Sequence, residues 1–329
     1  MKSVVVTKLG GPEVLQVMEQ PVPEPGLGQV RIRVAATSLN FADVKARQGQ
    51  YHNAGQPPFV PGLDVAGIID AVGTGVTSFV RGQRVIAFPS TGSYCEYTIA
   101  QEALTYLIPD ALAWESAAAL PTVGVTAYEL LTKVTRLSPG ESVLVHAAAG
   151  GIGTAALQLA KYLGAGRVIG TVGSDEKMAI AKEYGADVVI NYRNGSFADR
   201  VLEVTDKNGV DVILDAVAGD AFPDNLKCLA RFGRYVAFGN AGGRYGSVGT
   251  DELHGSCRSV LGYSMGTTRR YRPETLRPSV ESVLSLAAEG RLTVPVCARY
   301  PLKEAAAAQT LLESRTSTGK IILVIEPFL

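Results

Sequence analysis

The sequence is poor in the residues that form metal sites and disulfide frameworks. Its 329 residues include four cysteines, three histidines and one tryptophan. The cysteines, Cys95, Cys228, Cys257 and Cys297, are scattered and form no C-x-x-C pair, and the histidines lie far apart. A zinc site or a disulfide framework is therefore not expected, and free thiols are the default interpretation.

The chain also lacks an excess of charge and any long apolar run. It has 31 Lys and Arg against 31 Asp and Glu, with no long run of one sign, which gives no support for binding to nucleic acid or to an anionic membrane. No stretch approaches the length of a membrane span, and the apolar run at residues 4–6 is too short for a signal peptide. We therefore expect a cytoplasmic, globular protein.

The strongest local pattern lies between residues 141 and 192. An apolar run at 142–146 is followed by mostly small residues at 147–153, by a segment of helical period at 154–163 and by a second apolar run at 167–172. This order predicts strand, tight turn, helix and strand, the βαβ unit of a dinucleotide-binding domain. Backbone N–H groups at the start of such a helix bind a pyrophosphate.

The turn carries a variant of the G-x-G-x-x-G fingerprint, with Ala148, Gly150 and Gly153 at the glycine positions. Alanine fits the first position if that residue need not adopt a positive φ. The alternative is an ordinary turn without a ligand. The strand and helix patterns on both sides of the turn favour a cofactor site.

Two kinds of pattern divide the chain into two predicted domains. Residues 1–123 show mostly short strands between Gly and Pro clusters, which predicts a β-rich domain. Apolar strands alternate with helical segments over 124–264, which predicts an open parallel sheet covered on both faces. The alternation stops after that, and we expect residues 265–329 to return to the first domain. The fold class is thus α/β, a doubly wound Rossmann sheet plus a second, β-rich domain.

Five short motifs lie in a characteristic order along the chain. They are Asn40-Phe41-Ala42-Asp43 with Gly49 and Tyr51, PGLDVAG at residues 61–67, HAAAGGIG at residues 146–153, Phe238-Gly239-Asn240, and Thr318-Gly319-Lys320. In this combination the chain resembles, end to end, the zinc-free quinone oxidoreductase (zeta-crystallin-like) branch of the medium-chain dehydrogenase/reductase superfamily. The resemblance implies a GroES-like catalytic domain, a Rossmann domain, NADPH as hydride donor and commonly a homodimer.

The sequence departs from the wider superfamily at the metal site. Zinc alcohol dehydrogenases carry a cysteine and a histidine where this chain has Asn40 and the Leu63-Asp64 pair, and they have a cysteine-rich lobe that is missing here. Without a Lewis acid, alcohol–carbonyl interconversion loses its main electrostatic support. We therefore predict no metal ligands and an acceptor that takes hydride unaided, namely a quinone or an activated alkene such as an enone.

The residues after the second strand of the βαβ unit favour NADPH over NADH. An NAD site usually has an acid at the end of that strand, but Gly173 stands there, followed by Ser174. Ser174 and Lys177 supply a donor and a positive charge for a 2′-phosphate, and the resemblance adds Tyr192. The alternatives are that Ser174 caps a helix, that Lys177 is a solvated charge, and that Asp175 binds a ribose of NAD.

Three residues are the predicted catalytic set. By resemblance Asn40 faces the nicotinamide, and its amide is suited to bind an acceptor oxygen, although an asparagine also commonly orders a loop. Thr126 is a candidate contact to the nicotinamide or a helix threonine bonded to its own backbone. Tyr51, in a loop at the expected mouth of the pocket, is suited to stack on a planar acceptor or to donate a proton, and a packing role is the alternative.

The predicted cofactor site draws on both domains. It comprises Asn40, Thr126, Ala148, Gly150, Gly151, Ile152, Gly153, Gly173, Ser174, Lys177, Tyr192, Val217, Phe238, Gly239, Asn240 and Lys320. A cluster of three arginines and a tyrosine at residues 269–272 is a candidate contact for an anionic substrate such as a coenzyme A thioester, or else a solvated face.

Alternatives to a quinone or enone reductase stay open. The chain is also compatible with an enoyl-thioester reductase of a biosynthetic pathway, and with a crystallin-like structural protein that binds NADPH with little turnover. A strand at residues 256–261, at an edge of the Rossmann sheet, is expected to pair with its copy in a homodimer.

Overall fold

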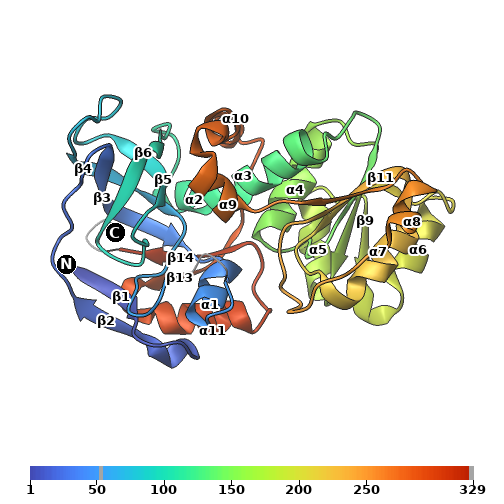
Figure 1. Ribbon diagram of the computed structural model, residues 1–329, viewed down its shortest axis with the longest axis horizontal. Coiled ribbons are helices and arrows are strands. Elements are labelled where there is room, and N and C mark those ends of the chain that lie inside the picture. Colours follow the sequence, from blue (N-terminus) through green and yellow to red (C-terminus); the bar gives the residue numbers. More distant parts are fainter. Residues whose placement is uncertain (52–54, 326–329) are drawn as a thin grey trace. The chain divides into compact units, whose positions relative to one another are not determined.

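A computed structural model describes residues 1–51 and 55–325 of the chain. Contacts between Cα atoms divide the chain into two compact units: unit 1 is Met1–Val125 with Met265–Leu329, and unit 2 is Thr126–Ser264. Each unit has its own six-stranded sheet (Figure 1). Each also has its own hydrophobic core. Residues 52–54, which directly follow Tyr51, lie outside the described residues.

Unit 1 is organised around a mostly antiparallel sheet with the strand order β13-β14-β3-β4-β5-β6. These strands are β3 (Gln29–Ser38), β4 (Val65–Val72), β5 (Arg84–Pro89), β6 (Tyr97–Leu107), β13 (Val296–Pro301) and β14 (Lys320–Val324), and a separate hairpin pairs β1 (Lys2–Val6) with β2 (Leu15–Glu19). Strand β3 pairs with both β4 and β6, so these strands close on themselves. Strand β14 from the end of the chain pairs with the other part of β3.

The sequence of β3 explains its central place in this sheet. Val30, Ile32 and Val34 are fully buried, whereas Arg31 and Arg33 between them are half-buried. This alternation places the three apolar side chains in the core of unit 1, because successive side chains of a strand point to opposite faces.

Short helices complete unit 1. They are α1 (Phe41–Arg47), α2 (Trp114–Ala119), α9 (Met265–Tyr271), α10 (Arg277–Ala288) and α11 (Ala305–Glu313), and α3 (Pro121–Glu129) contains the division between the units. The strand-rich pattern of residues 1–123 does not predict α1. This helix begins directly after β3, where a carboxylate oxygen of Asp43 accepts a hydrogen bond from the backbone N–H of Asn40 at 2.9 Å.

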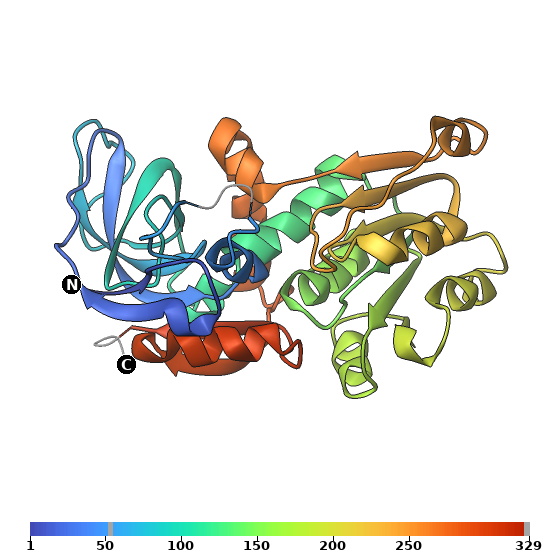
Figure 2. The same cartoon turned by 60° about the horizontal axis from the view of Figure 1, so that its bottom comes forward.

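Unit 2 has the predicted parallel sheet, whose strands lie among helices (Figures 1 and 2). Its strand order is β12-β11-β10-β7-β8-β9. Its strands are β7 (Ser142–Val145), β8 (Arg167–Val172), β9 (Val188–Asn191), β10 (Val210–Asp215), β11 (Leu229–Ala237) and β12 (Ser259–Gly262), and every neighbouring pair is parallel. The order reverses between β7 and β10, so the ends of these two strands form a topological switch point. The predicted α/β fold class is confirmed.

Helices alternate with the strands of unit 2. They are α4 (Gly151–Tyr162), α5 (Glu176–Glu183), α6 (Phe197–Val204), α7 (Phe222–Cys228) and the short α8 (Thr250–His254). Helix α6 begins where the Ser196 hydroxyl accepts a bond from the N–H of Asp199 at 3.2 Å, the usual role of a serine before a first turn. Phe197 and Val201 of α6 join Phe222 and Leu226 of α7 in the core on one face of the sheet.

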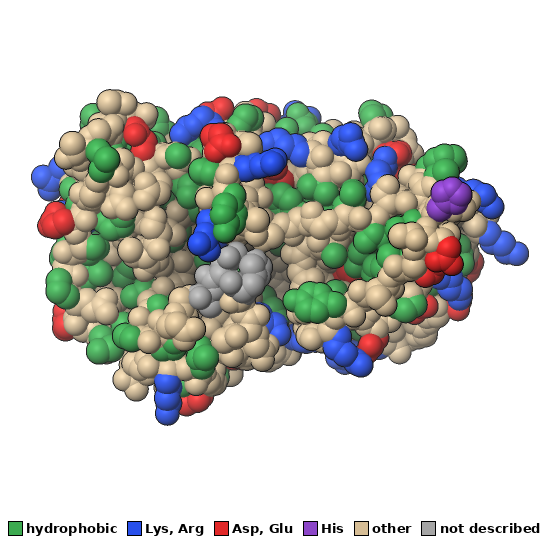
Figure 3. Space-filling model, viewed as in Figure 1, with side chains coloured by type: hydrophobic (Ala, Val, Ile, Leu, Met, Phe, Trp, Pro, Cys, Tyr) green, Lys and Arg blue, Asp and Glu red, His purple; other side chains and the backbone are tan. Residues whose placement is uncertain are grey.

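The surface carries both signs of charge. On the face seen in Figure 3, Lys and Arg side chains are interspersed with Asp and Glu. Within the described residues, no helix is long and apolar enough to cross a bilayer.

Candidate cofactor site and polar cluster

The glycine turn of unit 2 joins β7 to α4. Its first residue, Ala147, has φ +51°, and Gly150 closes the turn by donating its N–H to the carbonyl of Ala147 at 2.9 Å. A Cβ atom on Gly153 would lie 2.3 Å from the same carbonyl oxygen, so only glycine lets α4 approach the turn this closely. The N–H groups of the first helical turn have no partner within the helix and are available to an anion.

Two buried oxygens of unit 2 have no hydrogen-bond partner among the described residues. They are Thr126 Oγ1 on α3 and Asn240 Oδ1 in the loop after β11, and both residues belong to the predicted cofactor site. A buried polar atom without a partner destabilises the fold unless a water or ligand satisfies it. The donor-rich carboxamide and ribose groups of a nicotinamide nucleotide fit this requirement.

The loops that follow β10 and β11 pack tightly against each other. Added Cβ atoms on Gly239 and Gly242 would lie 2.8 Å from the carbonyl oxygens of Ala216 and Val217 respectively. In addition, the N–H of Gly242 donates to the carbonyl of Val217 at 2.8 Å. The predicted residues Val217 and Gly239 therefore lie in one compact pair of loops at the carboxyl ends of the strands.

The predicted 2′-phosphate residues lie after β8. A Cβ on Gly173 would lie 2.5 Å from the Tyr192 hydroxyl. The exposed Tyr192 ring can therefore adopt its observed position only because residue 173 has no side chain. A hydrogen bond from Ser174 lowers the pKa of the exposed Glu176 carboxyl. The carboxylate of Asp175 accepts a bond from the Asn191 side chain at 2.8 Å. Asp175, the residue considered as a ligand for the ribose of NAD, is therefore already hydrogen-bonded within the chain.

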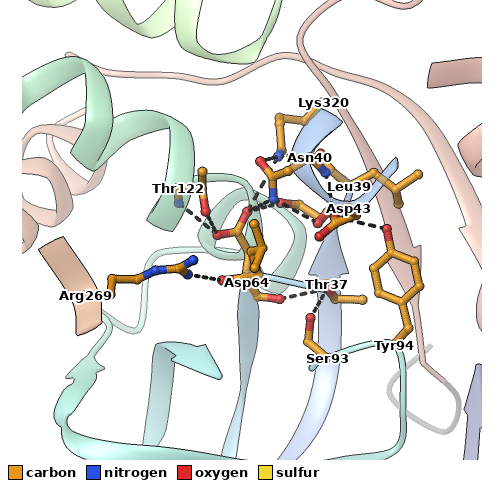
Figure 4. Close-up of polar contacts among 12 residues, drawn as sticks. Thr37, Leu39, Asn40, Asp43, Asp64, Ser93, Tyr94, Thr122, Arg269 and Lys320 are labelled. Atoms are coloured by element: carbon orange, nitrogen blue, oxygen red, sulfur yellow. Dashed lines mark hydrogen bonds and ion pairs between the residues drawn. The ribbon is translucent and has the colours of Figure 1, made fainter. Parts of the chain in front are cut away.

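Unit 1 holds a buried cluster of polar side chains around Asp64 (Figure 4). One Asp64 oxygen accepts bonds from the N–H and the hydroxyl of Thr122, at 2.8 and 2.5 Å, at the start of α3. The other accepts from the Ser38 hydroxyl at 2.6 Å and from the Asn40 amide at 2.7 Å. A carboxylate bonded in this way tolerates full burial.

Lys320 supplies the positive charge of this cluster. Its ammonium donates to Asn40 Oδ1 at 2.7 Å and to the Leu39 carbonyl at 2.6 Å, and it lies 3.6 Å from Asp64 Oδ2. Burial lowers the pKa of Lys320, and the nearby carboxylates oppose that shift. Thus both polar atoms of the Asn40 amide are engaged inside the cluster.

A second carboxylate, Asp43, completes the cluster. It accepts bonds from the Asn40 N–H at 2.9 Å and from the Tyr94 hydroxyl at 3.3 Å. Burial raises the pKa of Asp43 from 3.8 to about 7. The polar cluster, defined as Asn40, Asp43, Asp64, Thr122 and Lys320, is therefore dense in hydrogen bonds and nearly balanced in charge.

The structure distributes the predicted residues unevenly. It brings Asn40 into contact with Lys320 in unit 1. In unit 2, the glycine turn, the Gly173–Tyr192 pair and the Val217–Gly239 loops all follow the carboxyl ends of parallel strands. Tyr51 is half-buried. In the basic cluster after Ser264, Arg269 stacks on the Phe88 ring and donates to the Leu63 carbonyl at 3.2 Å.

Sequence reasoning assigned no role to Asp43 or Asp64, although each is at most 2% exposed. The two residues lie within two of the motifs, so their positions were visible. Their burial was not, because a carboxylate in a sequence is expected at the surface.

No group of three or more His, Cys, Asp or Glu suited to hold a metal ion occurs within residues 1–51 and 55–325. All four cysteines are free, and Cys95 and Cys228 are buried.

The chain is similar over nearly its whole length to known proteins. Residues 26–110 match the family described as alcohol dehydrogenase GroES-like domain, and residues 151–283 match the family described as zinc-binding dehydrogenase. The quinone oxidoreductase of Pseudomonas aeruginosa is 39% identical over 319 residues, which cover 96% of this chain and 97% of that protein.

Solved structures show the same similarity. The quinone oxidoreductase of Pseudomonas syringae pv. Tomato superposes with a TM-score of 0.92 at 38% identity, over 98% of this chain and 99% of that one. The Escherichia coli quinone oxidoreductase, solved in complex with NADPH, has a TM-score of 0.91 at 35% identity, over 98% and 100% of the chains. The predicted resemblance is confirmed, and the chain belongs to the quinone oxidoreductase family of the medium-chain dehydrogenase/reductase superfamily.

Proposed function

We propose that this protein is an NADPH-dependent oxidoreductase that transfers hydride to a quinone or an activated alkene without a catalytic zinc ion. The observation that carries the proposal is the pair of buried oxygens of Thr126 and Asn240, which find no hydrogen-bond partner in the part of the chain that the structure describes and lie in the same unit as the glycine turn. The NADPH complex of the similar Escherichia coli enzyme supports the choice of cofactor.

Each part of the proposed site has a task that follows from its chemistry. The N–H groups at the start of α4 bind the pyrophosphate, and Ser174, Lys177 and Tyr192 hold the 2′-phosphate. Thr126 and Asn240 accept bonds from the cofactor, which fixes its orientation. NADPH itself supplies the hydride, so the residues of the chain align donor and acceptor rather than carry out the chemistry.

The polar cluster supports zinc independence. In zinc alcohol dehydrogenases metal ligands stand at the positions of Asn40 and the Leu63-Asp64 pair. Here an ammonium group lies 2.7 Å from the Asn40 amide oxygen and 3.6 Å from Asp64. A divalent cation placed beside this ammonium would be repelled, whereas Lys320 already neutralises Asp64. Metal analysis of the purified protein tests this, and one tightly bound zinc ion per chain would contradict it.

The cofactor assignment is tested at Lys177. Replacing Lys177 by Ala should raise the dissociation constant for NADPH about tenfold, because a charge-assisted bond to phosphate is lost, and should leave that for NADH nearly unchanged. Lys182→Ala, on the exposed side of the same helix α5, is the matched control. Equal weakening of NADPH and NADH by the Lys177 change would refute the 2′-phosphate role.

The acceptor is tested with a substrate panel. NADPH oxidation is measured with a quinone, an enone and an enoyl thioester at equal concentration. Turnover with the quinone or the enone supports the proposal. A clear preference for the thioester would favour the enoyl-reductase alternative, and tight NADPH binding without turnover would favour a crystallin-like role.

We also propose a homodimer. Strand β12 is an edge strand of the unit 2 sheet and pairs, among the described strands, with β11 alone, so its other side could pair with a second copy. Sedimentation of the purified protein tests this, and a monomer at micromolar concentration would contradict it.

A further inference from the structure

A buried carboxylate at the end of β10 organises the loop that follows it. Asp215 is fully buried, and its Oδ1 accepts bonds from the backbone N–H groups of Val217 at 2.6 Å and Ala218 at 3.0 Å. Its Oδ2 accepts from Asn225 Nδ2 at 3.1 Å and from the Tyr235 hydroxyl at 2.8 Å. Within residues 1–51 and 55–325 no basic side chain forms an ion pair with it, so these four donors stabilise its charge.

The loop held by Asp215 has an unfavourable backbone conformation. Ala218 adopts φ +58° and ψ −157°, a region that is populated almost only by glycine. A residue with a Cβ stays in this region only when its surroundings fix it there. The bond from the Ala218 N–H to Asp215 is one such constraint, and the packing of the following loop against Ala216 and Val217 is another.

The same carboxylate is linked to the glycine turn. Asn225 donates to Asp215, and its Oδ1 lies 2.6 Å from His146 Nε2. His146 is the residue before Ala147 of the turn, and its Nδ1 lies 2.8 Å from Thr171 Oγ1 on β8. Because the Asn225 amide nitrogen faces Asp215, its oxygen accepts from His146 Nε2, and His146 Nδ1 in turn accepts from the Thr171 hydroxyl.

These residues, Asp215, Asn225, His146, Thr171 and Tyr235, form what we call the Asp215 network. Its members lie on β8, β10, α7 and β11 and directly after β7. The predicted cofactor residues follow the carboxyl ends of these same strands. A buried polar network in which every partner is satisfied holds its members in one arrangement.

We propose that Asp215 is a positioning residue for the nicotinamide cofactor. It fixes the backbone of Val217 and Ala218 directly. Through Asn225 and His146 it holds that loop in a fixed position relative to the glycine turn. The inference rests on the proposed NADPH-dependent function and goes beyond it, because no cofactor contact is assigned to Asp215 itself. Loss of the Asp215 charge should therefore weaken cofactor binding more than it impairs binding of the acceptor.

The test compares two aspartates of the same strand. Asp211 lies at the opposite end of β10, where its carboxylate accepts bonds from the N–H and hydroxyl of Ser142 at 2.8 and 2.7 Å. Asp211→Asn is thus matched to Asp215→Asn in residue type, strand and kind of partner. The dissociation constant of NADPH is measured by its fluorescence, with melting temperature and amide hydrogen exchange at Val217 and Ala218 recorded alongside.

We expect Asp215→Asn to raise the NADPH dissociation constant about tenfold and to speed exchange of the two loop amides. Asp211→Asn should leave both nearly unchanged while lowering the melting temperature. The Michaelis constant for the acceptor at saturating NADPH should be unchanged in either variant. If Asp215→Asn does not fold, Asn225→Ala serves instead, with an expected weakening of about threefold.

Unaltered NADPH affinity in Asp215→Asn, or equal weakening by Asp211→Asn, would overturn the assignment while leaving the proposed function intact. A wild-type protein that does not bind NADPH would overturn the proposed function and, with it, the positioning role.

Discussion

In unit 1 the predicted site residues Asn40 and Lys320 lie among polar and charged side chains that satisfy one another, whereas the glycine turn of unit 2 is built from residues without polar side chains. The polar cluster engages both atoms of the Asn40 amide, and Asp64 has hydrogen bonds to both of its oxygens. In the glycine turn the N–H groups at the start of α4 have no partner within the helix. In the same unit, Thr126 Oγ1 and Asn240 Oδ1 have no hydrogen-bond partner among the described residues.

This difference teaches two ways of holding a site in shape. The polar cluster is rigid because buried charges must keep their partners, so its stability and its geometry depend on the same hydrogen bonds. The glycine turn relies on steric fit between backbone atoms. The N–H groups at the start of α4 have no partner within the helix, so they remain able to bind an anion.

The largest effect is expected from removing the cation of the polar cluster. Lys320→Met should lower the free energy of unfolding by about 3 kcal/mol, because Asp64 is then left buried without its counter-charge and two acceptors lose their donor. Urea unfolding measures it. The double change with Asp64→Asn should recover part of the loss, and a single variant as stable as wild type would show that the cluster is not held by charge.

Adding a methyl group to the glycine turn tests whether the turn depends on close contact between backbone atoms. Gly153→Ala should cost about 2 kcal/mol and weaken NADPH binding, because its Cβ would lie 2.3 Å from the Ala147 carbonyl oxygen, which is backbone. Gly150→Ala is the control, since its Cβ would lie 3.2 Å from that atom. Thermal melts and NADPH titration measure both, and equal effects would contradict the close approach.

Titration of Asp43 tests the electrostatic half. Its pKa is raised from 3.8 to about 7, so between these values the folded chain holds a proton that the unfolded chain releases, and stability falls as the pH rises. The Asp43→Asn variant has no carboxyl group to titrate here, so it does not lose stability in this way. The difference in free energy of unfolding, variant minus wild type, should therefore increase by at least about 1 kcal/mol from pH 4 to pH 7. A difference independent of pH would contradict the raised pKa.

The smallest effect is expected from relieving the backbone strain at Ala218, in the loop that follows β10. Ala218→Gly should stabilise the protein by about 0.5 kcal/mol, because glycine adopts the observed φ and ψ without strain but loses more chain entropy on folding. The melting temperature measures the change. Ala216→Gly, in the same loop at a position without positive φ, should be neutral or destabilising.

Most of the fold could be predicted because periodicity is a local property. Apolar strands alternating with helical segments predicted the parallel sheet of unit 2, and motif order predicted the family. Helix α1 was not predicted, because its first-turn hydrogen bond from Asn40 to Asp43 and its burial against the rest of unit 1 do not show in a short segment.

What the sequence by itself determined about this protein is the family and the glycine turn, both of which depend on residue type and spacing along the chain. Only the tertiary structure decided the partners of the buried charges. Lys320 meets Asn40 across 280 residues, and Asp64 meets Thr122 across 58. Pairing over such separations depends on how the strands associate, and this long-range geometry is what links Asp215 to the glycine turn.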